Sequence, residues 1–313
     1  MSAEFAELVG SVLPVLLIIA LGMGLRRTSL LSDSLVAGLT HLVVAVALPA
    51  LLFTTFLTTQ FKPGHVWIIV MVFTVCVLLL GVGYIFRLLT RGSTYSPFLF
   101  TGFELGMIGF ALFTAVYGVE RLPALGVLAL GHELFVWFIF VSLLRATAHE
   151  SPSLSMTLRN LATSPVIVAI LSGLLFNALG WGPAILTSPL SVGVMTTLRY
   201  LAGIIVPLVL LIVGYGSRLT VAGVREALPL VLTRLTIAVG LALLLNAFVV
   251  RGVLGLDPIF EAGLFTLMVL PPPFIVPLFI PADRREDISY ANNVLSLYSL
   301  ASVGVFVAYV MLS

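Results

Sequence analysis

The sequence predicts an all-α integral membrane protein of ten transmembrane helices, and three observations lead to this class. Of the 313 residues, 60% are hydrophobic and only 9% are charged. Apolar runs of about 20 residues, the length that crosses a bilayer, recur along the whole chain. The short polar segments between them leave no room for a separate soluble domain.

Charged residues and glycine- or proline-containing breaks separate the predicted helices. The first five cover Phe5–Leu25, Ser32–Phe56, Val66–Leu89, Pro97–Tyr117 and Leu122–Ala146. The second five cover Pro165–Leu179, Pro189–Tyr215, Leu228–Val250, Pro258–Phe279 and Asp287–Leu312. We expect helix 1 to be retained, because Glu4 and Glu7 precede a run of full membrane length, unlike the basic start of a cleaved signal peptide. Cys76, the single cysteine, lies in helix 3 and is expected to be a core or lipid-facing residue.

The basic residues predict the orientation of the chain, because cytoplasmic loops attract Lys and Arg. Loops after the odd-numbered helices hold ten arginines: Arg26, Arg27, Arg87, Arg91, Arg145, Arg159, Arg218, Arg225, Arg284 and Arg285. The opposite loops hold Lys62, Arg121 and Arg251. Both termini are therefore expected on the non-cytoplasmic side of a bacterial inner membrane, with an even number of helices.

An internal repeat appears when the sequence is shifted by about 158 positions. The segment 20–24 (ALGMG) then overlays 178–182 (ALGWG), and Pro49 overlays Pro207. Five helices per repeat place residues 1–150 and 151–313 in opposite orientations, an arrangement typical of secondary transporters. A duplication in a protein that does not transport is the alternative.

The fourth helix of each repeat carries an interruption. In helix 4 we place it at Gly106–Gly109, and in helix 9 the run Pro271–Pro273 removes three backbone donors. Matching interruptions in both halves indicate the binding site of a transporter. Free N–H groups at the start of each second half-helix favour an anion. Packing glycines and a simple proline kink are the structural alternatives. The predicted substrate-binding residues are Gly106, Met107, Ile108, Gly109, Pro272, Pro273, Phe274, Ile275 and Val276.

Ionisable and amide side chains within the spans are candidates for ion coupling. Glu104 precedes the helix 4 break and is predicted to carry a coupling proton, to ligate a cation, or to bond freed backbone. His132 and Glu133 form either a proton relay or a structural hydrogen bond. Asn292 offers an amide to a ligand or a helix cap.

Three basic residues within the spans receive a simpler interpretation. Arg199 and His41 occupy matching positions, each eight residues before its repeat's proline. We expect Arg199 and Arg234 to extend toward the membrane surface, although an arginine at position 199 could also attract an anion.

On these residues the chain resembles the auxin efflux carrier family, in its bacterial branch of malonate and malate carriers. It is more distantly similar to the bile acid:sodium symporters. The resemblance spans essentially the whole chain and rests on the order of its motifs: ten helices, Pro49 and Pro207 late in helices 2 and 7, and crossed breaks in helices 4 and 9. It implies an elevator, with helices 1, 2, 6 and 7 as a scaffold and homodimer contact, Pro49 and Pro207 as scaffold hinges, and helices 3–5 and 8–10 carrying a mono- or dicarboxylate.

Helix 4 departs from the family pattern Asn-x-Gly-x-x-Gly-x-Pro-Leu. Glu104 stands at the Asn, Gly106 and Gly109 match, and Ala111 replaces the proline before Leu112. An acid at this position would repel an anionic substrate unless it is protonated or paired. A different coupling scheme or a different substrate is therefore open.

The residues favour transport over the other classes. No catalytic constellation and no nucleotide-binding glycine loop occurs, and the sole lysine, Lys62, lies in a loop, so we expect neither an enzyme nor an ATP-driven pump. No metal site and no cofactor beyond a coupling proton or sodium ion is expected, and no nucleic-acid partner. A sodium-coupled bile-acid-type symporter and a membrane sensor that binds a ligand without moving it stay open as alternatives.

Overall fold

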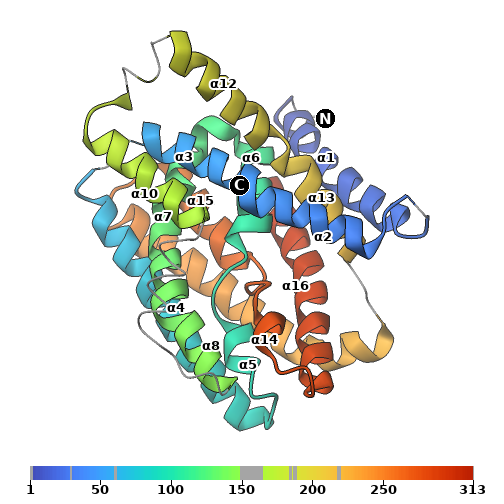
Figure 1. The fold of residues 1–313 in the computed structure, drawn as a ribbon. Coiled ribbons are helices and arrows are strands. Elements are labelled where there is room, and N and C mark those ends of the chain that lie inside the picture. The colour runs from blue at the N-terminus through green and yellow to red at the C-terminus, as the bar shows by residue number, and fades with distance from the viewer. Residues whose placement is uncertain are drawn as a thin grey trace.

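The computed structural model describes residues 3–28, 30–59, 62–148, 165–182, 185, 189–216 and 220–312. Within these ranges the chain consists of helices and their connections, which confirms the all-α prediction (Figure 1). Seven of the described helices are long and apolar enough to cross a membrane: Asp33–Thr58, His65–Thr90, Ser96–Tyr117, Val119–Thr147, Ser191–Gly216, Val221–Arg251 and Arg285–Leu312. The fold is therefore that of a multi-pass membrane protein.

Among the residues whose side chains the structure describes, three further apolar helices span 10–17 residues. They cover Leu13–Leu25, Pro165–Ala178 and Pro258–Val269, and they fall on the predicted helices 1, 6 and 9. Every predicted span thus coincides with a helical segment, and seven of the described helices meet both the length and the composition needed to cross a bilayer alone.

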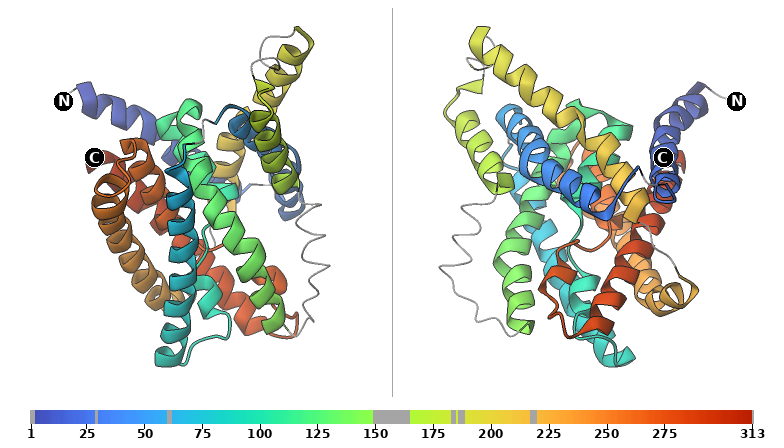
Figure 2. Two further views of the ribbon diagram at one scale, coloured as in Figure 1. Left: turned by 90° about the vertical axis from the view of Figure 1, so that its left-hand side faces the viewer. Right: turned by 45° about the vertical axis from the view of Figure 1, so that its right-hand side comes forward.

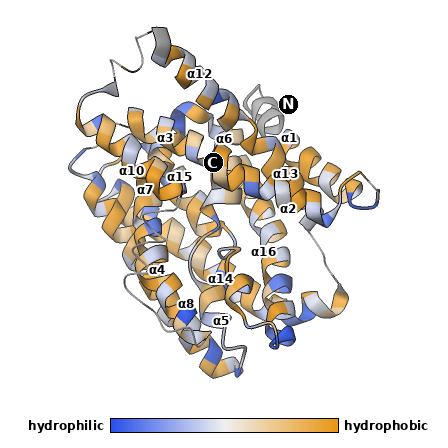
Figure 3. Cartoon of the chain, viewed as in Figure 1, coloured by the Kyte–Doolittle hydropathy of each residue, from blue (hydrophilic) through white to orange (hydrophobic). Residues whose placement is uncertain are grey.

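Hydrophobic residues predominate along the helices (Figure 3), and many of the large ones are exposed on the surface. Leu78, Leu88 and Phe248 are exposed, with 59%, 78% and 67% of their surface accessible. A soluble protein rarely exposes apolar patches of this extent, whereas hydrocarbon tails solvate them well. The surface composition therefore agrees with the membrane class.

One group of helices comes from the predicted helices 1, 2, 6 and 7. It contains α1 (Ala3–Leu25), α2 (Asp33–Leu42), α3 (Leu48–Thr58), α10 (Pro165–Ala178), α12 (Pro189–Gly203) and α13 (Ile205–Gly216). Within the group, α10 and α12 pack against α3, and α1 packs against α13. These helices lie in the upper part of Figures 1 and 2.

Two glycines bring α1 and α13 together backbone to backbone. A Cβ atom on Gly22 would collide with the carbonyl oxygen of Leu211, and one on Gly214 would collide with that of Ile19. Small residues at a crossing let two membrane helices approach until their backbones touch. The contact between α1 and α13 therefore depends on both glycines.

The remaining helices lie in the middle and the lower part of the molecule, with α4, α8 and α14 toward the lower end of the view (Figure 1). They are α4 (His65–Thr90), α7 (Leu122–Phe135), α8 (Val141–Thr147), α14 (Val221–Leu245), α15 (Pro258–Val269) and α16 (Arg285–Leu312), together with the broken helix 4 described below. Here α4 packs against α7, and α14 packs against both α15 and α16. This packing brings the interrupted helices 4 and 9 into one core.

Local irregularities precede both prolines that the predicted repeat aligns. A π-helical turn, Val43–Ala47, comes just before Pro49, and the helix is interrupted at Ile204, three residues before Pro207. A proline ring clashes with the carbonyl group four residues earlier, and a widened or broken turn relieves that clash. Pro49 is partly exposed and Pro207 is exposed.

Several of the arginine-rich connections meet at one end of the molecule. Ser93, two residues after Arg91, donates to a carboxylate oxygen of Asp287, which follows Arg284 and Arg285. The guanidinium of Arg145 lies 5.5 Å from the ring centre of Phe279. Three of the five loops with predicted cytoplasmic charge therefore lie side by side; Arg159 and Arg218 lie outside the described residues.

Candidate substrate site at two broken helices

The break in helix 4 lies one turn earlier than predicted. Helix α5 (Ser96–Phe100) ends before the non-helical residues 101–104, and a π-helical segment (Leu105–Gly109) then leads into α6 (Phe110–Tyr117). Gly106 and Gly109 are therefore helical, and Glu104 is part of the break. Gly102 has φ +68° and faces Pro273, where a Cβ atom would lie 2.8 Å from the proline Cγ, so glycine suits both its backbone and its space.

The break in helix 9 contains the three prolines, as predicted. Helix α15 ends at Val269, and the chain is not helical from Leu270 until the short 3₁₀ helix Val276–Phe279. We expected a second half-helix to begin here, and that expectation is wrong. With four prolines between 271 and 277, too few backbone donors are left to sustain an α-helix.

The two breaks touch each other. The N–H group of Glu104 donates to the carbonyl oxygen of Pro271 across 2.8 Å. Gly109 sits against Leu270, because a Cβ atom on it would lie 2.6 Å from the leucine Cδ1. The interrupted segments therefore cross at one point inside the protein, which we call the crossover.

The Glu104 carboxylate accepts hydrogen bonds from N–H groups of both breaks. Oε1 accepts from the N–H of Met107 at 3.1 Å, and Oε2 accepts from the N–H of Phe274 at 2.7 Å. The first contact is an N-cap of the segment that runs on through α6. Of the predicted roles for Glu104, the structure therefore shows the bond to freed backbone.

Arg234 donates hydrogen bonds to carbonyl groups of both breaks. We predicted that it extends to the membrane surface, and that prediction is wrong. Its side chain is fully buried in the middle of α14. The guanidinium donates to the carbonyl oxygens of Leu99 (3.2 Å), Gly102 and Leu270 (3.4 Å). An arginine can do this because its planar group holds five donors in a rigid fork.

Aromatic rings complete the surroundings of Arg234. Its guanidinium carbon lies 4.7 Å from the ring centre of Tyr298 in α16 and 5.5 Å from that of Phe103 in the helix 4 break. Such cation–π contacts stabilise a desolvated cation by about 2 kcal/mol. The charge of Arg234 is thus held by backbone dipoles and π-faces.

His132 and Glu133 form a short hydrogen-bonded chain that ends at the helix 4 break. The N–H of Phe103 donates to His132 Nε2 at 2.9 Å, so this nitrogen is an acceptor and carries no proton. His132 Nδ1 lies 3.3 Å from Glu133 Oε1, and the indole of Trp137 donates to Glu133 Oε2 at 3.0 Å. The geometry is that of a neutral histidine supporting the backbone beside Glu104.

Carbonyl groups at the breaks accept hydrogen bonds from the protein itself. Pro271 O accepts from Glu104 N, and Glu104 O accepts from the N–H groups of Ile108 and Gly109. Among the described residues, no group of three or more His, Cys, Asp or Glu could hold a metal ion.

A cavity of about 220 Å³ lies beside the crossover and will be called the crossover cavity. Its wall includes Met107 and Phe274, the two residues whose N–H groups bind Glu104. It also draws on α2, α13 and α16, so both helix groups contribute. The lining residues are Thr40, Met107, Ile212, Val213, Gly216, Phe274, Leu295, Ser296 and Ser299.

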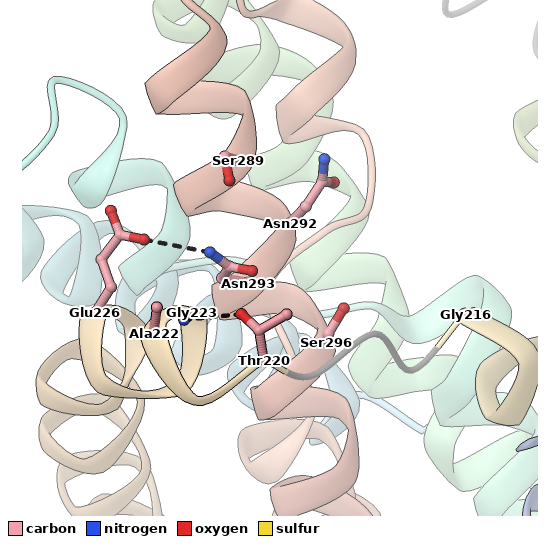
Figure 4. Close-up of a pocket in the computed structure, with 9 residues that line it drawn as sticks. All are labelled: Gly216, Thr220, Ala222, Gly223, Glu226, Ser289, Asn292, Asn293 and Ser296. Atoms are coloured by element: carbon pink, nitrogen blue, oxygen red, sulfur yellow. Dashed lines mark hydrogen bonds between the residues drawn. The ribbon is translucent and has the colours of Figure 1, made fainter.

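A larger cavity of about 800 Å³ adjoins the first and shares Gly216 and Ser296 with it. This polar cavity lies between the start of α14 and α16 (Figure 4). Asn293 donates to Glu226 at 3.2 Å within it, and Asn292, which is exposed, lines it too. The remaining lining residues are Thr220, Ala222, Gly223 and Ser289. Asn292 thus lines the polar cavity and not the crossover cavity.

Sequence reasoning found two of the residues that line the crossover cavity, Met107 and Phe274. Gly106 and Ile275 are partly exposed, and the other predicted substrate-binding residues are buried: Ile108, Gly109, Pro272, Pro273 and Val276. His41 and Arg199 are exposed. Thr40, Ser296 and Ser299 were missed, because hydroxyl groups in an apolar helix carry no distinctive sequence signal.

No family model matches the chain, and a search of the curated proteins returned no match.

Proposed function

We propose that the protein is a secondary transporter that moves a small organic molecule by alternating access around the crossover. The observation that carries the proposal is the meeting of two broken helices beside a cavity that both helix groups line. In transporters, irregular backbone at membrane depth occurs where it surrounds a binding site. The adjoining polar cavity gives the site a route to the end of the molecule where the arginine-rich loops gather.

The finer architecture belongs to the same proposal. We propose ten spans in two inverted repeats, residues 1–150 and 151–313, with both termini on the non-cytoplasmic side of a bacterial inner membrane. Helices 1, 2, 6 and 7 would form a scaffold and homodimer contact, and the remaining helices would move as in an elevator. The paired irregularities before Pro49 and Pro207 support the repeat. Membership of the auxin efflux carrier family and a carboxylate substrate stay predictions.

Gly216 offers a direct test, because it lines both cavities and a Cβ atom there would meet nothing within 4 Å. Gly216→Phe should block the route without disturbing packing. Gly240→Phe is the matched control, since Gly240 is exposed on α14 with equally open space. Both variants and the wild type would be reconstituted in proteoliposomes, and uptake of labelled organic anions, amines and neutral compounds would be measured under imposed pH and sodium gradients.

We expect saturable uptake of at least one compound by the wild type and by Gly240→Phe, and loss of that uptake in Gly216→Phe. Equal uptake by both variants would contradict the proposed route. Binding of a compound without uptake by the folded wild type would favour a sensor instead.

A further inference from the structure

The crossover already contains an anion of the protein's own. The N–H groups of Met107 and Phe274, which would bind an anionic substrate, both donate to the Glu104 carboxylate. Glu104 is partly exposed, and both of its partners line the crossover cavity. A substrate carboxylate would have to displace Glu104 or lie beside a like charge, which is unfavourable in a site of low dielectric.

The positive charge of the crossover faces away from the cavity. Arg234 is fully buried, and its donors point to the carbonyl groups of Leu99, Gly102 and Leu270. Among the described residues, Glu226 is the only charged side chain that lines either cavity. The two charged side chains placed at these cavities, Glu226 in the polar cavity and Glu104 bonded to two residues of the crossover cavity wall, are therefore both acidic.

The hydroxyl groups of the crossover cavity add acceptors. Thr40 Oγ1 donates its proton to Val36 O at 2.9 Å, and Ser299 Oγ donates to Leu295 O at 2.7 Å. Each oxygen then has only lone pairs to offer a ligand. Ser296 contributes a third hydroxyl group and Gly216 no side chain, and the other five residues of the wall are apolar: Met107, Ile212, Val213, Phe274 and Leu295.

We propose that the crossover cavity binds an organic cation, a protonated amine on an apolar body, with Glu104 as its counter-charge. This inference rests on the proposed function, since it names the substrate class of the same site. Each carboxylate oxygen that accepts one backbone N–H keeps a second lone-pair direction for an ammonium group. The Phe274 ring in the wall suits both the apolar body and the positive charge.

The experiment compares three probes of similar size: phenethylammonium, 2-phenylethanol and phenylacetate. Equilibrium binding to the purified protein in detergent would be measured by calorimetry at one pH and one ionic strength. We expect phenethylammonium to bind about tenfold or more tightly than the other two, the effect of one charge-assisted hydrogen bond. Glu104→Gln should reduce this preference to about threefold or less.

A second pair of variants leaves the crossover intact. Ser299→Ala removes one acceptor from the cavity wall and should weaken phenethylammonium binding about tenfold, because a hydrogen bond from an ammonium group is charge-assisted. Ser302→Ala is the matched control, because Ser302 is a buried serine of the same helix that donates to Ser299 O and lies outside the cavity wall. It should bind the probe as the wild type does.

Tighter binding of phenylacetate than of phenethylammonium, or binding of none of the probes, would overturn the inference. The binding assay needs no membrane and thus separates this inference from the proposed function. Uptake of phenylacetate into proteoliposomes would retain the transporter and reject the cation. Binding of phenethylammonium without uptake would retain the cation site and reject the transporter.

Discussion

Glu104 and Arg234 bind opposite kinds of backbone group at the same crossover: Glu104 binds N–H groups, and Arg234 binds carbonyl groups. The carboxylate accepts the N–H groups of Met107 and Phe274, and the guanidinium donates to the carbonyl groups of Leu99, Gly102 and Leu270. A broken helix leaves donors on one side of the gap and acceptors on the other. Two side chains of opposite charge therefore satisfy the unpaired backbone donors and acceptors of both breaks.

Removal of Arg234 should destabilise the protein strongly. Arg234→Met leaves the Leu99, Gly102 and Leu270 carbonyls without this donor, and each unpaired buried group costs about 1–3 kcal/mol. We expect a loss of about 3 kcal/mol or more in the free energy of unfolding, seen as a lower melting temperature in detergent. Arg199→Met is the control: Arg199 is exposed, and its loss should leave the melting temperature unchanged. Equal melting temperatures for both variants would contradict the capping role.

Glu104→Gln should also lower stability, by about 1–3 kcal/mol, because an amide offers one acceptor oxygen to two backbone N–H groups. Its NH₂ group would then face one of those donors. Glu286→Gln, at an exposed position in the first turn of α16, is the matched substitution and should be neutral. Thermal unfolding of both in the same detergent measures the difference; a stable Glu104→Gln would show that the bonds to Met107 and Phe274 contribute little.

His132→Leu should weaken the helix 4 break, because it removes the acceptor for the buried N–H of Phe103. The unpaired donor should cost about 1–3 kcal/mol. His41→Leu, at an exposed position in α2, provides the comparison. Melting temperatures give the cost, and faster amide hydrogen exchange at Phe103 in His132→Leu would locate it. Unchanged exchange there would rule out the bond as a stabilising contact.

The crossing of α1 and α13 makes a sharp prediction for two glycines of one helix. Gly22→Ala places a methyl group against the Leu211 carbonyl and should cost about 1–3 kcal/mol. Gly24→Ala meets nothing within 4 Å and should be neutral or stabilising, by up to about 1 kcal/mol, through helix propensity. Melting temperatures decide between them, and a destabilised Gly24→Ala with a tolerated Gly22→Ala would reject the observed crossing.

The proposed orientation can be tested at the two ends of α4. Cys76, the single cysteine, is fully buried, and Cys76→Ser provides the background for introducing Lys62→Cys or Arg91→Cys at exposed positions. A membrane-impermeant maleimide should label position 62 in spheroplasts and position 91 only after lysis. Labelling in the reverse order would invert the proposed topology.

The sequence by itself determined the class of the protein and the place where helix 9 is interrupted. Apolar runs fix where helices lie, since an unpaired backbone in lipid costs more than any local preference. The prolines at 271–273 end a helix by covalent geometry alone, and α15 stops at Val269 accordingly. The position of a helix and its interruption by prolines both depend on the local sequence alone, and both were predicted in the right place.

Only the tertiary structure decided how the breaks are satisfied. Glu104 and Phe274 are 170 residues apart in the chain, and Arg234 and Leu99 are 135 apart. Nothing local separates an arginine that caps carbonyl groups from one that extends to the membrane surface, so Arg234 was misjudged. The position of the helix 4 break was missed for a similar reason, because Gly102 at this break packs closely against Pro273, which lies far away in the sequence. Partners in hydrogen bonds between distant segments are chosen by packing, which a local pattern does not encode.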